Sequence, residues 1–109
     1  VNEPTFPGCV MEVKPIGVFH MADDKGPDEK VICVPVSDPI WNSLENLSDI
    51  NPHLLKEIEH FFQVYKDLEN KQVDVEGWGD VNEAYAIIKE CTERFNQIEN
   101  KPEGLFSIK

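Results

Sequence analysis

The sequence predicts an α+β protein with a mainly β core, in which two strands come first and two amphipathic helices follow. Apolar and β-branched residues gather in residues 9–21 and 31–36, a composition typical of strands. Two later stretches repeat apolar residues every three or four positions, which indicates helices with one buried face. With 109 residues the chain has room for one domain and hardly two, so we expect a single domain over residues 1–109. A polar end with turn residues predicts a flexible tail over residues 100–109.

The two strands are expected to be joined by a long acidic loop. Asp-Asp and Gly-Pro supply turn chemistry within residues 22–29, between the two apolar runs. The second run, residues 31–36, hardly alternates between apolar and polar residues, which favours burial on both faces. Such a strand would need more chain on each side than this sequence provides. Cys33 lies in that run and is expected to be a buried small hydrophobe.

The first helix has a well-marked start. Asn51 is a favoured N-cap residue, and Pro52 is favoured at the first helical position. A broad apolar stripe then predicts a helix from Pro52 to about Glu69. The stripe consists of Leu54, Leu55, Ile58, Phe61, Phe62, Tyr65 and Leu68. Before the helix, a connector is expected, with one short helical turn near residues 39–44.

A short strand over residues 73–78 and a second helix ending near Asn96 complete the predicted pattern. Asp80 and Glu83 have the spacing of a capping box, with Asp in place of Ser or Thr. The apolar face of this helix is expected to be buried. It comprises Ala84, Ile87, Ile88, Cys91, Phe95 and Ile98.

The chain carries a formal net charge of -11. This charge argues against nucleic acid as a partner, because phosphate backbones attract clustered Lys and Arg. It argues against anionic membrane surfaces for the same reason, and no apolar run approaches the roughly 20 residues of a membrane span. An acidic surplus suits divalent cations, which take oxygen ligands, although most surface charges simply keep a protein soluble.

The chain has three cysteines, Cys9, Cys33 and Cys91, which lie far apart and form no Cys-x-x-Cys pair. A disulfide framework or a zinc site is therefore not expected. Free cysteines fit a reducing compartment, so we expect a cytoplasmic protein, with an organelle as the alternative.

Acidic and basic side chains crowd the stretch "MADDKGPDEKVICVP". Asp23 and Asp28 stand five residues apart across a Gly-Pro turn, and Lys30 begins the following strand. A loop can bring two such carboxylates to one point, where they would suit Mg²⁺ beside a phosphate held by the lysine. By residue type alone, an ordinary charged loop is the favoured interpretation. An EF-hand is excluded, because a Gly26 at its sixth position would put Met21 where the loop needs Asp.

Tyr65 and Lys66 form a second polar feature at the end of the first predicted helix. Their hydroxyl and ammonium groups could reach a common anion, or they could be a core tyrosine and a surface lysine. Spacing alone does not decide between the two. His20, His53 and His60 have no metal-ligand spacing, and no nucleophilic triad or Gly-rich phosphate loop occurs.

The stretches "IGVFHMADDKGPDEKVICVPVSDPIW" and "HFFQVYKDLENKQVDVEGW" together resemble the C-terminal part of the family I soluble inorganic pyrophosphatases. The shared pattern is Met-x-Asp-x-x-x-x-Asp-x-Lys, then Val-Pro, then His-Phe-Phe-x-x-Tyr-Lys. The likeness extends from about Glu3 to Phe95, and two motifs in matching order make it specific. The resemblance implies part of a closed five-stranded barrel of OB-like type, with the two helices packed outside it.

The resemblance also implies an activity, Mg²⁺-dependent hydrolysis of pyrophosphate to two orthophosphates. Asp23 and Asp28 match catalytic carboxylates that hold metal ions. Lys30 matches a catalytic lysine that contacts phosphate, and Tyr65 with Lys66 matches a phosphate-binding pair. Family members form dimers or hexamers, so a homo-oligomer is expected.

One family motif is missing from this sequence. An Asp-x-Asp-Pro-x-Asp motif, whose aspartates hold metal and activate the attacking water, is expected just before the segment that begins here. The 109 residues contain no such motif, so the chain alone is expected to be catalytically incomplete. The alternative is a non-catalytic truncated paralogue that binds phosphate weakly or associates with a full-length subunit.

Overall fold

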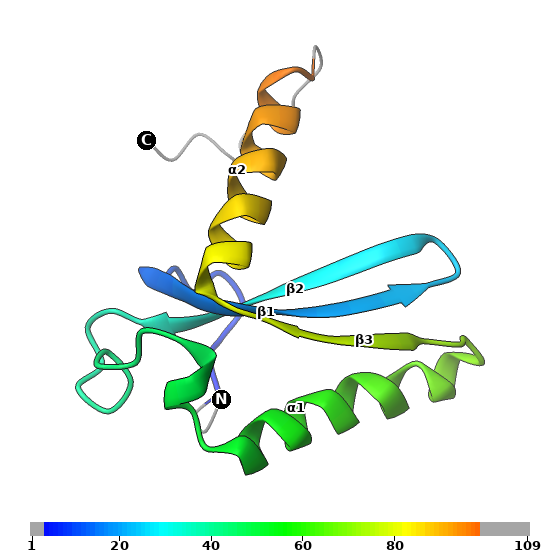
Figure 1. The fold of residues 1–109 in the computed structure, drawn as a ribbon, viewed down its shortest axis with the longest axis horizontal. Helices are drawn as coiled ribbons and strands as arrows, with labels where there is room; N and C mark the ends of the chain where they lie inside the picture. Colours follow the sequence, from blue (N-terminus) through cyan, green and yellow to red (C-terminus); the bar gives the residue numbers. More distant parts are fainter. Residues whose placement is uncertain (1–3, 99–109) are drawn as a thin grey trace.

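A computed structural model describes residues 4–98 of the chain, and Figure 1 shows the arrangement of its elements. The three strands pair antiparallel in the order β2-β1-β3, with β1 in the centre. The predicted mixture of strands and helices is confirmed. The sheet is open in the part of the chain that is described, so the closed five-stranded barrel is not confirmed. In chain order the elements are β1 (Val13–Asp23), β2 (Gly26–Pro35), η1 (Leu47–Asp49), α1 (Pro52–Tyr65), η2 (Asp67–Glu69), β3 (Asp74–Gly79) and α2 (Val81–Asn96).

The predicted long acidic loop is wrong, because β1 and β2 form a tight hairpin. Asp23 pairs with Gly26 in the register, which leaves only Asp24 and Lys25 in the turn. Gly26 has a φ of 115°, a conformation that glycine adopts without steric cost. Asp23 closes the turn by accepting a hydrogen bond from the backbone N–H of Lys25 at 2.9 Å. The acidic residues therefore belong to paired strands, and β1 begins at Val13 rather than at residue 9.

The register gives the sheet two distinct faces, because successive side chains of a strand point to opposite sides. On β1, Phe19 and Asp23 share one face, and on β2 the half-buried Asp28 and Lys30 lie on the same face. This face looks toward α1, since the ring of Phe19 stacks on that of Phe62 at 5.7 Å between centroids. The second helix, α2, packs against the opposite face of β1.

One cluster of the hydrophobic core lies between the sheet and the segment that precedes α1. Its buried members are Ile16, Val34, Leu47 and Ile50, with Trp41 and Trp78 among the partly buried side chains around them. The other buried apolar residues are Val18, Phe19 and Met21 of β1 and Ala84 of α2. On β2 only Val34 is buried, so burial of this strand on both faces is not observed, and Cys33 is exposed. The prediction for Cys33 was wrong because no described element covers its side of the strand.

The helix α1 begins as predicted and ends earlier. The side chain of Asn51 accepts a hydrogen bond from the N–H of His53, and Pro52 occupies the first turn. The helix stops at Tyr65, and the 3₁₀ turn η2 follows in place of the last predicted helical residues. The short helical turn predicted near residues 39–44 is instead a set of hydrogen-bonded turns, and the 3₁₀ helix η1 follows it.

The helix α2 has the predicted capping box and the predicted end. Asp80 accepts from the N–H of Glu83 while Glu83 accepts from the N–H of Asp80, and the helix runs to Asn96. Figure 1 shows α2 standing away from the sheet along most of its length. Only Ala84 of its apolar face is buried, and Cys91 is exposed, so the expected burial of Cys91 was wrong. The tail predicted over residues 100–109 lies outside the described residues. Among the described residues, no helix is long and apolar enough to cross a membrane.

Candidate active site

The sequence singled out five residues, and the fold brings them to one end of the sheet. Asp23 ends β1, Asp28 and Lys30 lie on β2, and Tyr65 ends α1 with Lys66 directly after it. Figure 1 shows the β1–β2 hairpin and the end of α1 at the same end of the molecule. Asp23 and Lys66, which are 43 positions apart in the sequence, are therefore brought together by the fold.

Asp23 and Lys66 form an ion pair between the hairpin and the end of α1. The Nζ of Lys66 donates to Oδ2 of Asp23 at 3.4 Å, and the two side chains are only 11% and 10% exposed. The hydrogen bond from the Lys25 backbone N–H is the main cause that lowers the pKa of Asp23; burial opposes it, and Lys66 adds to the lowering. Asp23 is therefore a carboxylate at neutral pH.

Lys66 is the one buried charged residue in the described part of the chain. Burial alone would lower its pKa, but hydrogen bonds with Asp23 and Tyr65 outweigh burial and raise that pKa above its usual value. The ammonium also lies 5.4 Å from the ring centroid of Tyr65, within the range of a cation–π contact. Lys66 is thus a cation that is held in place by two neighbours.

A second ion pair joins Asp28 and Lys30 on the same face of the sheet. Their Oδ2 and Nζ atoms lie 2.9 Å apart, and each side chain is about one-third exposed. Asp28 is two residues beyond Gly26, the partner of Asp23 in the register, so the two carboxylates are diagonal neighbours across the hairpin. Two carboxylate–lysine pairs therefore stand side by side at this end of the sheet.

Aromatic rings of α1 lie over these pairs, a feature that the sequence prediction missed. The Nζ of Lys30 lies 5.6 Å from the ring centroid of Phe62, and the rings of Phe62 and Tyr65 meet edge to face at 6.1 Å. Phe61 stacks on Tyr65 with an interplanar angle of 7°. The i, i+3 and i, i+4 spacing of these rings was the available signal, because such residues are neighbours on a helix surface.

This set of groups suits a phosphate compound together with a divalent cation. Two ammonium groups and a phenol can donate to phosphate oxygens. Two carboxylates fit Mg²⁺, which takes one or two of them and completes its shell with water and phosphate oxygens. Within residues 4–98 no group of three or more His, Cys, Asp and Glu side chains could hold a metal alone, so the remaining ligands would come from water, substrate oxygens or groups elsewhere in the whole protein.

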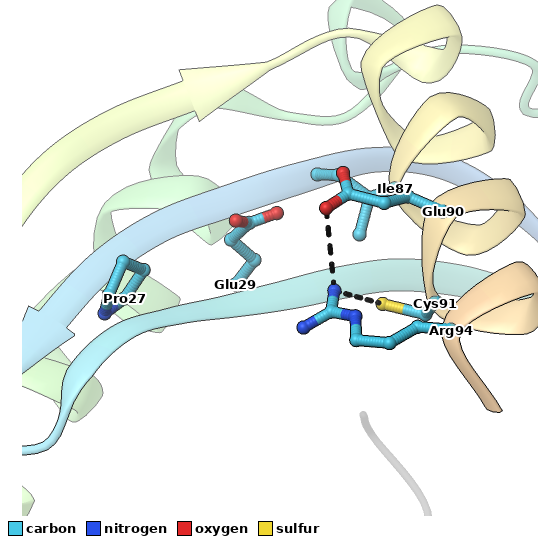
Figure 2. Close-up of a pocket in the computed structure, with 6 residues that line it drawn as sticks. All are labelled: Pro27, Glu29, Ile87, Glu90, Cys91 and Arg94. Atoms are coloured by element: carbon cyan, nitrogen blue, oxygen red, sulfur yellow. Dashed lines mark hydrogen bonds and ion pairs between the residues drawn. The ribbon is translucent and has the colours of Figure 1, made fainter. Parts of the chain in front are cut away.

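A shallow hollow of about 400 Å³ lies elsewhere, between β2 and the middle of α2. Figure 2 shows Glu29 on β2 facing Glu90, Cys91 and Arg94 of α2 across it. The guanidinium of Arg94 already contacts Glu90 at 3.5 Å and the sulfur of Cys91 at 3.7 Å. None of the five predicted site residues lines this hollow, so it is separate from the candidate site.

His20 and Asp24, the polar neighbours of the site, lie outside the cluster. His20 is on the face toward α2, where its Nε2 lies 3.4 Å from a carboxylate oxygen of Glu83. Asp24 is exposed in the hairpin turn. Neither contributes to the two carboxylate–lysine pairs.

Comparison with known proteins gives a consistent result. The family model "Inorganic pyrophosphatase" matches residues 1–96. The inorganic pyrophosphatase of Methanosarcina mazei is 52% identical over 95 residues, a match that covers 87% of this chain and 56% of that protein. The inorganic pyrophosphatase of a Synechocystis strain is 40% identical over 95 residues, with the same two coverages.

Solved structures agree with the sequence matches. The inorganic pyrophosphatase of Thermus thermophilus superposes with a TM-score of 0.82 at 36% identity, covering 87% of this chain and 56% of that one. That of Neisseria gonorrhoeae gives a TM-score of 0.81 at 39% identity, covering 89% and 57%. The chain thus spans a little over half the length of its relatives, and its place in their C-terminal part stays a prediction from motif order. The chain belongs to the inorganic pyrophosphatase family.

Proposed function

We propose that this chain supplies one wall of the active site of an Mg²⁺-dependent enzyme that hydrolyses pyrophosphate to two orthophosphates. The main support for the proposal is that two ion pairs, Asp23–Lys66 and Asp28–Lys30, lie next to each other on one face of the sheet. Family membership adds to it, because the relatives are named inorganic pyrophosphatases.

The basic groups would bind the phosphate part of the substrate. Lys30 and Lys66 present ammonium donors from the sheet and from the end of α1, and the Tyr65 hydroxyl can donate beside them. Hydrolysis forms a bond from a water oxygen to one phosphorus and breaks the bridging P–O bond, and the two phosphate products together retain both hydrogens of the water. The departing phosphate gains negative charge in that step, and preorganised cations stabilise such charge most effectively in a site that excludes water.

Asp23 and Asp28 would hold Mg²⁺. When bound, the cation supplies charge neutralisation of the phosphates and activation of the attacking water. Both carboxylates now lie beside ammonium groups, and Mg²⁺ would have to replace these groups as the partner of each carboxylate. Because the sequence lacks the Asp-x-Asp-Pro-x-Asp motif, we expect weak turnover from the chain on its own.

The proposal extends to the setting of the site. The open sheet would be part of a five-stranded OB-like barrel, and the whole protein would be a cytoplasmic homo-oligomer that binds neither nucleic acid nor membranes. Among residues 4–98 no strand pairs with the outer edge of β2 or β3, and such edges are compatible with further strand pairing because they present unpaired backbone groups.

Phosphate release from pyrophosphate in the presence of Mg²⁺ tests the proposal. In the whole protein, Asp23→Asn and Asp28→Asn should each lower kcat by about 10²–10³-fold, a loss typical for removal of one electrostatic group. Glu29→Gln is the matched control, because Glu29 is exposed on the opposite side of β2. Wild-type turnover in either aspartate variant would contradict the assignment of that residue as a metal ligand. Robust turnover by the 109-residue chain would contradict the expectation that the chain alone is catalytically incomplete.

A further inference from the structure

The ring of Phe62 lies at the centre of the candidate site, although nothing in its chemistry suggests a direct role. It stacks on Phe19 of the sheet at 5.7 Å with an interplanar angle of 21°. On its other sides it meets the ammonium of Lys30 at 5.6 Å and the ring of Tyr65 at 6.1 Å. One side chain therefore touches two of the three groups that would bind phosphate.

We propose that Phe62 is a positioning residue that holds Lys30 and Tyr65 in the geometry in which they bind the phosphate groups of a diphosphate. This inference rests on the proposed function and adds to it a residue that the motif matches leave without a role. Phe62 itself would make no contact with the reacting atoms.

The contact with Lys30 has a specific physical advantage. A lysine stem has four flexible carbons, and its ammonium must be ordered before it can bind phosphate well. Asp28 orders the ammonium but engages an N–H donor, which is then not free for phosphate. A ring face attracts the ammonium through the quadrupole of the ring and leaves N–H donors available.

The contact with Tyr65 acts on the same site from the helix. Phe62 and Tyr65 are three residues apart on α1, so their rings are neighbours on its surface. The edge of one ring meets the face of the other at 78°, a favoured arrangement for aromatic pairs. Phe61 stacks on the same tyrosine at 5.5 Å, so the ring of Tyr65 is confined by two phenylalanines.

The burial of Phe62 differs from that of a simple core residue. Phe19, which stacks on it, is completely buried, whereas Phe62 is only partly buried and has the ammonium of Lys30 within 5.6 Å of its ring centroid. A ring that served packing alone would not need a cation beside it. We therefore assign the contact between Phe62 and Lys30 to the candidate site on this face of the sheet.

The first test needs no ligand. In the ¹³C-labelled chain, the methylene protons next to Nζ of Lys30 should resonate upfield, because they lie near the ring of Phe62, and Phe62→Leu should remove that shift. Phe62→Tyr should restore it. Tyr85→Leu is the control and should leave Lys30 unchanged, because Tyr85 is an exposed ring on α2, which packs on the other face of the sheet. An unchanged Lys30 signal in Phe62→Leu would overturn the inference.

The second test varies the charge distribution of the ring at nearly constant shape. Phenylalanine with one, two or three fluorines at position 62 weakens the quadrupole stepwise, and calorimetry measures binding of methylenediphosphonate with Mg²⁺. We expect affinity to fall steadily along the series, by about two- to fivefold in total, the size of an exposed cation–π contact. A purely structural role would leave the affinity flat, since the packing is kept. Thermal melting of each variant confirms that it is folded.

The two tests separate the inference from the function on which it rests. If the wild-type chain binds the diphosphonate and the fluorinated series shows no trend, the positioning role is wrong and the proposed function stands. If the Lys30 shift depends on Phe62 but the whole wild-type protein binds no diphosphonate, the contact stands and the proposed function is wrong. A trend in affinity together with the Lys30 shift supports both.

Discussion

The Nζ of Lys66 lies 3.4 Å from Oδ2 of Asp23, and both side chains are almost nine-tenths buried. This pair links the β1–β2 hairpin to the end of α1, two parts of the chain that are far apart in the sequence. Buried ion pairs are weak evidence for stability, because desolvation offsets much of the attraction. The adjacent carboxylates and ammonium groups instead offer both kinds of partner that a metal-bound phosphate compound would need.

A double-mutant cycle tests the pairing of Asp23 and Lys66. Asp23→Asn or Lys66→Met alone leaves the partner charge without its counterpart, so each should lower the free energy of unfolding. The double variant should lose less than the sum of the two single losses, because it leaves neither charge unpaired. Urea unfolding of the four chains measures the coupling, and additive losses would show that the contact carries no energy.

The pH dependence of stability should follow from the same two groups. The folded-state pKa of Asp23 is lowered from 3.8, so its contribution is present above that pH and is lost as pH falls through the lowered value. The pKa of Lys66 is raised from 10.5, so its contribution is present below that pH and is lost as pH rises through the raised value. The stability difference between wild type and Asp23→Asn should therefore be constant around neutral pH and shrink in acid below about pH 4. A difference that changed between about pH 6 and pH 8 would contradict this assignment.

Close packing of Gly17 against Leu47 predicts a clear effect on the core. A Cβ at position 17 would overlap the Leu47 side chain, so Gly17→Ala should destabilise the fold by about 1–3 kcal/mol, as overpacking commonly does. Leu47→Ala alone should cost about 2–5 kcal/mol through the cavity that it leaves. The double variant should be more stable than the sum of the two losses predicts, since the new methyl group enters that space. Denaturant midpoints measure this, and strict additivity would place Gly17 away from Leu47.

The capping box of α2 predicts a smaller effect. Asp80→Ala removes the side-chain acceptor that receives the N–H of Glu83 at 3.0 Å, so it should cost about 1 kcal/mol. Asp80→Asn should retain most of the stability, because Asn is an equally good N-cap residue. Thermal melting compares the two variants, and equal losses would indicate that the charge of Asp80 matters more than its hydrogen bond.

Local chemistry predicted the helix starts well, because caps act over a few neighbouring residues. Asn51 with Pro52 and Asp80 with Glu83 occupy the expected positions. The hairpin was mispredicted because its tight turn depends on the positive φ of Gly26. The charged residues around Gly26 were instead interpreted as a longer loop.

Tertiary contacts, by contrast, were beyond the reach of sequence patterns. Motif matches named Lys30 and Lys66, but nothing in their spacing predicts which carboxylate each one meets. The exposure of Cys33 was likewise unpredictable, because burial depends on which other elements cover a strand. Phe62 was recognised only as part of an apolar stripe, since a cation beside a ring appears only after the sheet and α1 have packed together.

The most direct test of the central claim is an NMR titration of the labelled chain with methylenediphosphonate and Mg²⁺. The claim is that Asp23, Asp28, Lys30, Tyr65 and Lys66 form one diphosphate- and metal-binding surface. We predict saturable shifts at the β1–β2 hairpin and at the end of α1, with no change along residues 87–94 of α2 beside the separate hollow. Shifts confined to that part of α2, or the absence of saturable shifts at Lys30 and Lys66, would contradict the claim.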